Sequence, residues 1–380
     1  MKNPFLFGPP VSGDQFYDRE ELGRELFRAV ENGTNVLLYG PRRYGKSSLV
    51  ARVAEKLRAD GHPCIFFDMM KVNSMEHFLQ AYASAALSLQ GRATKSLSAL
   101  ARFLKGLRPK LTIGETGEPS LEMDFSGGPP TTKTLEDVLA LPESIRTDGK
   151  NVVVVFDEFQ EIERLSSDLP AERIFRSVIQ RQKHVNYVYL GSRTHLLKRM
   201  FTDAARPFYQ SALVLEMEKP PRDESVAFLR DRFLHGGIHA DAAALEAIVD
   251  ASENVPYYLQ ALAYEAFEQA DAVGRKTLSA ADIPDALARC IRRMRDSFET
   301  VVENLSDNQR TVLSSLAREP TASFDTAYRT RYRLPVYTSI ASALKVLVSK
   351  GLVESSRRTH RVADPFLAAW LREPVCRTAT

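Results

Sequence analysis

An eight-residue loop between an apolar run and an amphipathic run is the feature that most constrains the fold of this chain. Residues 40–47 read Gly-Pro-Arg-Arg-Tyr-Gly-Lys-Ser and match the pattern G-x-x-x-x-G-K-[ST]. The preceding residues 36–39 are typical of a short buried strand, and residues 46–57 are typical of a helix. In such a turn the backbone N–H groups point at phosphate oxygens, and the helix N-terminus adds positive charge. We therefore expect a phosphate-binding loop within a parallel α/β sheet.

Two side chains of this loop have predicted roles toward ATP or ADP and Mg²⁺. Lys46 is expected to reach the β- and γ-phosphates, and the Ser47 hydroxyl is expected to bind Mg²⁺. Arg42 and Arg43 lie inside the loop, and the sequence leaves open whether they contact phosphate or stay in solvent.

A second apolar strand is predicted to bring two acids to the same edge of the sheet. Residues 152–156 are four valines and a phenylalanine, which suits a strand that is buried on both faces, and Asp157 and Glu158 follow them. We expect Asp157 to hold Mg²⁺ directly or through water, and Glu158 to orient or deprotonate an attacking water. On an extended strand tip the two side chains would point in opposite directions. The alternative is a strand that ends in a solvated acidic turn.

A third strand, predicted over residues 187–190, ends in polar residues. Ser192 and Arg193 are candidates to face the γ-phosphate if this strand lies beside the other two; otherwise this is an ordinary polar strand end. The residues with predicted catalytic roles are Glu158, Lys46, Ser192 and Arg193.

The alternation of strands and helices predicts the organisation of the chain. We expect a P-loop parallel sheet with helices on both faces, then a helical lid, then a winged helix. The predicted domains are residues 1–218, 219–298 and 299–380, with an inserted hairpin near residues 108–127 at the periphery of the sheet. Asp18 is a candidate N-cap of the first helix, and residues 221–295 look entirely helical.

Short signals outline the last domain. Ser306 and Gln309 form a capping box ahead of a helix, and Gly351 suits the end of a helix over residues 336–350. Two short strands near residues 352–354 and 360–362 form the expected wing.

Composition excludes several classes of protein. The 380 residues are 44% hydrophobic and 26% charged, which is enough apolar material for a sizeable core and excludes disorder as the main state. The net charge of +3 argues against a general nucleic-acid coat or a polybasic membrane binder, although residues 301–380 contain 12 Lys and Arg against 7 Asp and Glu.

Three dispersed cysteines exclude a disulfide framework and a CxxC metal pair. No apolar run approaches the length of a membrane span or signal peptide, so we expect a cytoplasmic protein without membrane contact.

Five segments in order give the chain a family resemblance. They are residues 10–22 with Phe16-Tyr17-Asp18, residues 39–49 around the loop, residues 155–162 with Asp157-Glu158-Phe159-Gln160, residues 254–260, and residues 362–370. Together they resemble the archaeal-type ATPase family, which belongs to the STAND class of AAA-like P-loop NTPases and is related to replication initiators of the Orc/Cdc6 kind. The resemblance covers nearly the whole chain.

The resemblance implies further details of the site. The strand over residues 187–190 would lie between the P-loop strand and the strand of the two acids. Phe16 and Tyr17 would line the adenine through their backbone, and Pro256 would approach the nucleotide from the lid. The family often has Gly-x-Pro where this chain has Asn254-Val255-Pro256, so the resemblance leaves the exact lid geometry open but still implies the Pro256 contact. The sequence does not identify any arginine as an arginine finger, and Arg193 is the candidate for this role. The predicted nucleotide-binding residues are Phe16, Tyr17, Gly40, Pro41, Arg42, Arg43, Tyr44, Gly45, Lys46, Ser47, Ser48 and Pro256, and the predicted metal ligands are Ser47 and Asp157.

Three functions compete at this point. The first is a slowly hydrolysing ATP switch in signalling or regulation, with an unknown protein partner and nucleotide-dependent self-association. The second is an ATP-dependent DNA-binding protein acting through residues 299–380. The third, a small-molecule kinase, is the weakest, because a helical lid and a winged helix do not form an acceptor pocket.

The predicted winged helix separates the first two functions. The polar residues expected to point outward from its recognition helix are Tyr337, Thr338, Ser339, Ser342 and Lys345, and those expected inside are Ile340, Leu344 and Leu347. The arginines available for phosphate contacts are Arg329, Arg331, Arg333, Arg357, Arg358 and Arg361. The alternatives to DNA contact are a solvated face or a face docked on the ATPase core.

Overall fold

The computed structural model describes residues 2–8, 19–89, 108–113, 119–125, 128–145, 149–166, 169–355 and 359–373. The chain divides into two units, and we describe each by itself. The sheet unit is Arg19–Glu218, and the helical unit is Lys219–Thr380 together with Met1–Asp18. The N-terminal residues were predicted with the sheet, but Asn3 Nδ2 donates hydrogen bonds to Tyr264 O (3.1 Å) and Glu268 Oε1 (2.7 Å) of the helical unit.

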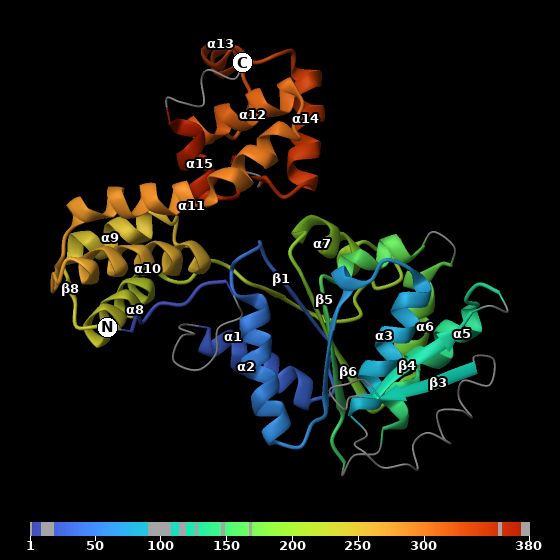
Figure 1. Cartoon of the computed structure of the whole chain (residues 1–380). Coiled ribbons are helices and arrows are strands. Elements are labelled where there is room, and N and C mark those ends of the chain that lie inside the picture. Colours follow the sequence, from blue (N-terminus) through green and yellow to red (C-terminus); the bar gives the residue numbers. More distant parts are fainter. Residues whose placement is uncertain are drawn as a thin grey trace. The chain divides into compact units, whose positions relative to one another are not determined.

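The sheet unit is built on five parallel strands in the order β2-β5-β6-β1-β7 (Figure 1). The strands are β1 (Val36–Tyr39), β2 (Cys64–Asp68), β5 (Val152–Asp157), β6 (Val185–Gly191) and β7 (Leu213–Glu216). The expected position of β6 between β1 and β5 is confirmed, and the predicted parallel sheet with it.

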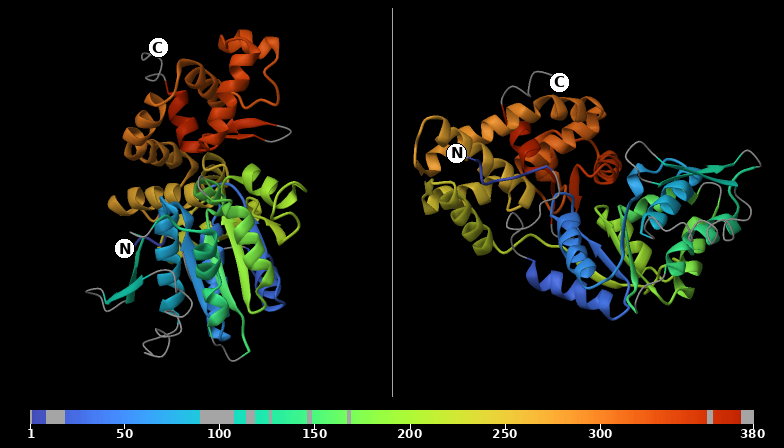
Figure 2. Two further views of the ribbon diagram at one scale, coloured as in Figure 1. Left: turned by 90° about the vertical axis from the view of Figure 1, so that its right-hand side faces the viewer. Right: turned by 60° about the horizontal axis from the view of Figure 1, so that its bottom comes forward.

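Helices cover both faces of this sheet, as predicted (Figure 1; Figure 2 shows the layers from two other directions). Helices α1 (Glu20–Glu31) and α2 (Lys46–Ala59) pack on one face. The other face is covered by α3 (Met75–Ser88), α5 (Thr132–Leu139), α6 (Ala171–Arg181) and α7 (Thr194–Thr202), with short 3-10 segments η2 (Met69–Lys71), η3 (Leu141–Ser144) and η4 (Phe159–Ser166). Val152, Val154 and Phe156 join the core of that second face. Val153 and Val155 are equally buried but point the other way, since side chains alternate along a strand.

Three local predictions for the sheet unit need correction. The hairpin of β3 (Arg108–Ile113) and β4 (Pro119–Asp124) exists, but it is a separate two-stranded sheet rather than part of the main one. Helix α1 has Arg19 at its N-cap position with a left-handed φ of 73° and no side-chain cap, and Asp18 lies outside the described residues. The apolar run over residues 65–67 predicts a buried strand, yet Phe66 of β2 is 41% exposed because β2 is an edge strand.

The helical unit contains a bundle of four long helices followed by the predicted winged helix. The bundle helices are α8 (Arg222–His235), α9 (Ala242–Ala251), α10 (Pro256–Ala272) and α11 (Ile283–Glu303). The region is not entirely helical, because β8 (His239–Ala240) and β9 (Thr277–Leu278) form a short parallel pair, and η5 (Ala280–Asp282) precedes α11. The winged helix consists of α12 (Asp307–Arg318), α13 (Thr326–Tyr332), α14 (Tyr337–Ser349), β10 (Val353–Ser355), β11 (His360–Val362) and α15 (Pro365–Arg372).

Local signals of the winged helix are confirmed in detail. Ser306 and Gln309 form the reciprocal capping box of α12. Gly351 follows α14 with a φ of 72°, a conformation that glycine adopts without strain. On α14, Ile340 and Leu347 are buried as predicted, whereas Leu344 is only half-buried and Ala343 takes the inner position.

Aromatic contacts join the bundle to the winged helix. The rings of Tyr258 on α10 and Phe366 on α15 meet edge to face, with centroids 4.9 Å apart. The ring centroids of Phe298 on α11 and Trp370 on α15 lie 5.8 Å apart. All four side chains are almost completely buried, so these helices share one core. Among the described residues, no helix combines the length and the apolar character needed to cross a membrane.

Candidate nucleotide-binding site

The carboxyl ends of three neighbouring strands bring the predicted residues of the sheet unit together. The loop 40–47 follows β1, Asp157 is the last residue of β5, and Ser192 directly follows β6. In an open parallel α/β sheet, ligands bind outside this edge. Sequence positions that are more than 100 residues apart thus form a single polar cluster.

The loop conformation depends on its two glycines. A Cβ atom on Gly40 would lie 2.6 Å from the carbonyl oxygen of Met217, so a side chain at this position would collide with backbone. Gly45 has a φ of 92° at the N-cap of α2. The loop therefore turns directly into the helix N-terminus, as the motif requires.

Lys46 is held inside the loop. The residue is only 6% exposed, and its Nζ donates hydrogen bonds of 2.8 Å to the carbonyl oxygens of Gly40 and Pro41. Burial lowers the pKa of Lys46 to about 8, although the negative charges of Glu158 and Asp157 act in the opposite direction. The amine is thus an ammonium donor placed next to two carboxylates.

Ser47 and Asp157 form the candidate metal site. Ser47 Oγ donates to Asp157 Oδ2 at 2.9 Å, and Asp157 Oδ1 accepts the N–H of Glu158 at 2.9 Å. Burial raises the pKa of Asp157, against the effect of the hydrogen bond from Ser47. A hydroxyl that donates its proton to a carboxylate keeps its lone pairs, and hydroxyl and carboxylate oxygens are the hard ligands that Mg²⁺ prefers. The donor set therefore fits Mg²⁺.

Glu158 differs from the prediction in its backbone. It has a φ of 52°, so it is not the second residue of an extended strand tip. Its Oε2 accepts hydrogen bonds from Ser192 N (3.0 Å), Ser192 Oγ (2.9 Å) and Gln160 Nε2 (2.5 Å). Burial acts to raise the pKa of Glu158, but the hydrogen bonds from Gln160 and Ser192 outweigh it and the pKa is lowered. Asp157 and Glu158 do face different partners, although the left-handed turn at Glu158 and not strand alternation separates them.

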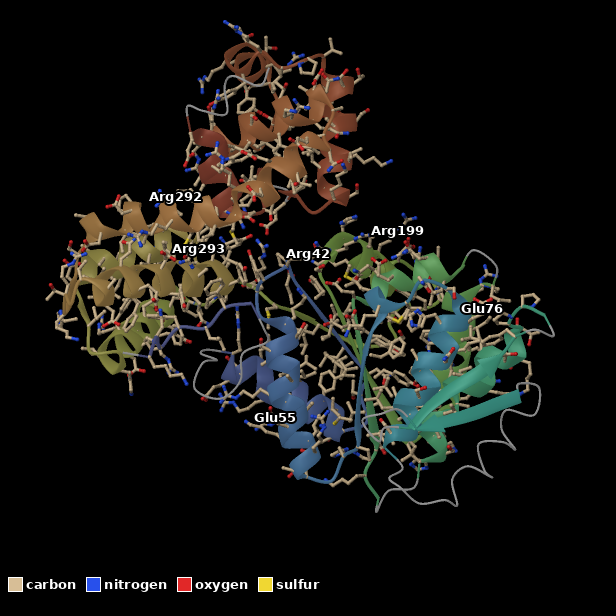
Figure 3. All side chains as sticks on the ribbon, viewed as in Figure 1. Arg42, Glu55, Glu76, Arg199, Arg292 and Arg293 are labelled. Atoms are coloured by element: carbon tan, nitrogen blue, oxygen red, sulfur yellow. The ribbon has the colours of Figure 1, made fainter. Side chains whose placement is uncertain are left out.

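Ser192 and Arg193 have different surroundings. Arg42, labelled in Figure 3, extends from the loop and its Nε donates to Ser192 Oγ at 3.3 Å. Ser192 therefore connects the loop to Glu158. Arg193 forms an ion pair with Glu161, with its Nη2 3.7 Å from Glu161 Oε1. Its predicted contact with the γ-phosphate remains a prediction.

Sequence reasoning did not assign a role to Gln160. It appeared only within the family-like segment, although its position two residues after Glu158, close to the end of a predicted strand, was a usable signal. The side chain is 4% exposed and is one of the three donors to Glu158 Oε2.

Other predicted residues lie apart from this cluster or outside the described residues. Tyr44 within the loop and Ser48 on α2 are buried, and Arg43 is exposed with a φ of 69°. Phe16 and Tyr17 lie outside the described residues. Pro256 begins α10 in the helical unit, so its approach to a nucleotide remains a prediction.

Asn254, which stands where a glycine is expected before Pro256, still forms a tight turn. Asn254 has a φ of 57°, the left-handed conformation that a glycine adopts freely and that asparagine tolerates better than most residues. Its Nδ2 donates to Pro220 O at 2.7 Å, which holds the turn. The substitution therefore keeps the local turn before Pro256.

These features define a P-loop ATPase, and comparison with known proteins agrees. Residues 16–219 match the family described as an ATPase domain predominantly from Archaea, and the chain belongs to this family. Residues 296–373 match a probable winged helix domain. The resemblance found in the sequence is confirmed. No curated protein matches the sequence.

Solved structures with the same fold extend over nearly the whole chain. A Walker-type ATPase of Pyrococcus abyssi is 20% identical, with a TM-score of 0.68 over 97% of this chain and 100% of the other. The Orc2 protein of Aeropyrum pernix, in ADPNP and ADP complexes, is 18% identical with a TM-score of 0.55, covering 96% and 93% of the two chains. The Orc1 protein of the same organism, in complex with DNA, is 16% identical with a TM-score of 0.53, covering 97% and 94%. At these identities the similarity establishes the fold.

Proposed function

We propose that this protein is an ATP-binding switch that hydrolyses ATP slowly, and that its nucleotide state controls the arrangement of the lid and the winged helix. The observation that carries the proposal is the cluster of Lys46, Ser47, Asp157 and Glu158 at one edge of the sheet. It contains a phosphate-binding cation, two metal-ligand oxygens and a carboxylate for water.

Each side chain has a distinct task in this proposal. The phosphates replace the carbonyls of Gly40 and Pro41 as acceptors for Lys46. Ser47 and Asp157 would hold Mg²⁺, whose charge would offset that of the phosphates. Glu158 orients the attacking water and accepts its proton. The hydrogen bonds from Gln160 and Ser192 lower the pKa of Glu158, so the carboxylate is ionised and can accept a proton.

The helical unit supplies the responding part of the switch. Because α10 and α15 share a buried core through Tyr258 and Phe366, a displacement of the lid carries the winged helix with it. A nucleotide moves this equilibrium only by its difference in affinity for the two arrangements. We therefore expect ATP and ADP to differ in affinity for the arrangement that exposes the winged helix to partners or to a second copy.

Nucleotide content and hydrodynamic size test the switch together. The purified protein should contain ADP or ATP, and its sedimentation coefficient or mass should differ between ADP and ATP. Glu158→Gln should remain in the ATP form after wild type has returned to the ADP form. Hydrolysis without any change in size, mass or proteolytic pattern between the two nucleotides would contradict the switch and leave an ordinary ATPase.

A second candidate function is ATP-dependent DNA binding through the winged helix. Helix α14 exposes Tyr337, Thr338, Ser342 and Lys345 as expected for a recognition helix, and the Orc1 relative was solved with DNA. Two of the predicted phosphate contacts are already occupied, because Arg331 pairs with Glu319 (2.6 Å) and Arg361 with Glu354 (2.5 Å). Arg357 and Arg358 lie outside the described residues.

Salt dependence separates the two functions. If the full-length protein binds DNA through this face, its affinity for duplex DNA should fall steeply between about 50 and 200 mM salt. Lys345→Ala should lower the slope of log affinity against log salt by about one unit. No measurable DNA binding at low salt, with ADP or with ATP, would leave the switch with protein partners.

A further inference from the structure

Glu158 is held by one of its two carboxylate oxygens. All three hydrogen bonds from Gln160 and Ser192 reach Oε2. Within the part of the chain that the structure describes, no residue donates a hydrogen bond to Oε1. One oxygen is therefore anchored, and the other keeps its full capacity to accept a hydrogen bond.

The amide of Gln160 is built into this place. The side chain is 4% exposed, and its Oε1 is buried without a hydrogen-bond partner. Rotating the amide by 180° would turn that oxygen toward the carboxylate of Glu158, which has no proton to share. The orientation that gives the N–H to Glu158 is thus maintained at the cost of an unsatisfied acceptor, which is unusual for a residue that only fills space.

Gly191 makes room for this amide. A Cβ atom at position 191 would lie 2.2 Å from Gln160 Oε1 and 2.4 Å from Leu197 Cδ1. Any side chain here would push the amide of Gln160 away from its position. Gly191, the last residue of β6, and Gln160, in η4 after β5, therefore form one structural feature.

We infer that Gln160 is a positioning residue for ATP hydrolysis: it anchors Oε2 of Glu158, seated against Gly191, so that Oε1 is left to hold the attacking water. The inference rests on the proposed role of Glu158. Ser192 shares the anchoring, but its hydroxyl also receives a hydrogen bond from Arg42 and depends on the loop, whereas Gln160 is fixed within the core.

The test compares variants at position 160. Gln160→Met keeps the length and removes the donor, and Gln160→Glu keeps the shape and places a like charge beside Glu158. With saturating Mg²⁺-ATP we expect single-turnover hydrolysis to fall roughly 10- to 100-fold in Gln160→Met, and further in Gln160→Glu, because a misplaced reacting group costs about that much. The Kd for ATP should stay within about threefold of wild type. Gly191→Ala should reproduce the Gln160→Met phenotype.

Gln182→Met is the matched control. This glutamine of the same unit forms two side-chain hydrogen bonds, accepting from Tyr187 and donating to Leu139 O, but neither joins it to the cluster. It should lose some thermal stability and keep the wild-type hydrolysis rate. Circular dichroism and ATP affinity confirm that each variant is folded.

A double-mutant cycle decides between positioning and general support of the structure. If Gln160 acts through Glu158, Gln160→Met should cause no further loss of rate in the Glu158→Gln background. Equal loss in both backgrounds, or a wild-type rate in Gln160→Met, would overturn the inference. A wild-type rate in Glu158→Gln alone would instead refute the proposed role of Glu158, and the inference would fall with it.

Discussion

Two clusters of this protein differ in the groups that hold their carboxylates. At the sheet edge, Asp157 and Glu158 are held by neutral donors, namely the hydroxyls of Ser47 and Ser192 and the amide of Gln160. At the turn between α9 and α10, residues 252–255, which we call the lid turn, Glu253 is held by cations. Arg361 Nη1 lies 3.0 Å from its Oε2, and Lys219 Nζ lies 3.6 Å from the same oxygen.

The difference shows what each cluster can do. Neutral donors fix the position of a carboxylate but leave its negative charge available to a metal ion or to a proton from water. The charge of a carboxylate between an arginine and a lysine is already neutralised, so its role is to connect segments of the chain. The lid turn joins three segments in this way, since Arg361 belongs to the wing strand β11 and Lys219 is the first residue of the unit after the sheet.

The largest expected effect is at Glu158. Glu158→Gln keeps the size of the side chain but removes the charge that accepts the water proton. Single-turnover hydrolysis should fall about 10²–10⁴-fold, while ATP affinity stays near wild type because Lys46, Ser47 and Asp157 are unchanged. Glu55→Gln is the matched control, because Glu55 is exposed on α2 (Figure 3) and should behave as wild type. Normal turnover in Glu158→Gln would remove this residue from the catalytic role.

Replacing the metal-ligand carboxylate should weaken binding itself. Asp157→Asn removes the charge that completes the candidate metal site with Ser47. Calorimetric titration with ATP should show an affinity loss of at least about tenfold with Mg²⁺ and a much smaller one with EDTA. Asp60→Asn, in the exposed position after α2, is the control. An equal loss with and without Mg²⁺ would show that Asp157 acts on the loop rather than on a metal.

Lys46→Ala removes the cation that faces the phosphates. A charge-assisted contact of this kind contributes about 1.5–3 kcal/mol, so ATP affinity should fall about 10- to 100-fold, whether Mg²⁺ is present or not. Lys56→Ala, exposed on the same helix, should bind normally. Unchanged affinity in Lys46→Ala would refute the assignment of the loop as a phosphate site.

The smallest effect is expected at the lid turn. The pair of Arg361 and Glu253 is about one third exposed, and such pairs contribute about 0–1 kcal/mol each. Arg361→Ala and Glu253→Gln should show a coupling energy of that size in urea unfolding, with no change in the hydrolysis rate of an ATP-saturated protein. Arg292→Ala, exposed on α11 (Figure 3), controls for loss of surface charge. A strong effect on hydrolysis would show that the ion pair of Arg361 and Glu253 takes part in the catalytic cycle.

Local sequence signals predicted most elements because they act over a few residues. The capping box of Ser306, the turn at Gly351 and the four valines of β5 each depend on neighbours in the chain, and each is present in the structure. The errors arose where a distant partner decides. Phe66 is exposed because β2 is the edge strand of the sheet, and β3 and β4 form a separate sheet because they pair with each other.

The same distinction applies to the candidate site. The sequence by itself determined the phosphate-loop motif at residues 40–47, the acid pair Asp157 and Glu158, and the class of protein. It could do so because the residues of these motifs lie close together in the chain, in one turn and at one strand end. Only the tertiary structure showed that Ser192 and Gln160 share one oxygen of Glu158, that Gly191 makes this possible, and that Asn254 takes the backbone conformation of a glycine. These contacts join neighbouring strands and separate turns, and their geometry follows from strand order and from two left-handed residues, which no local pattern encodes.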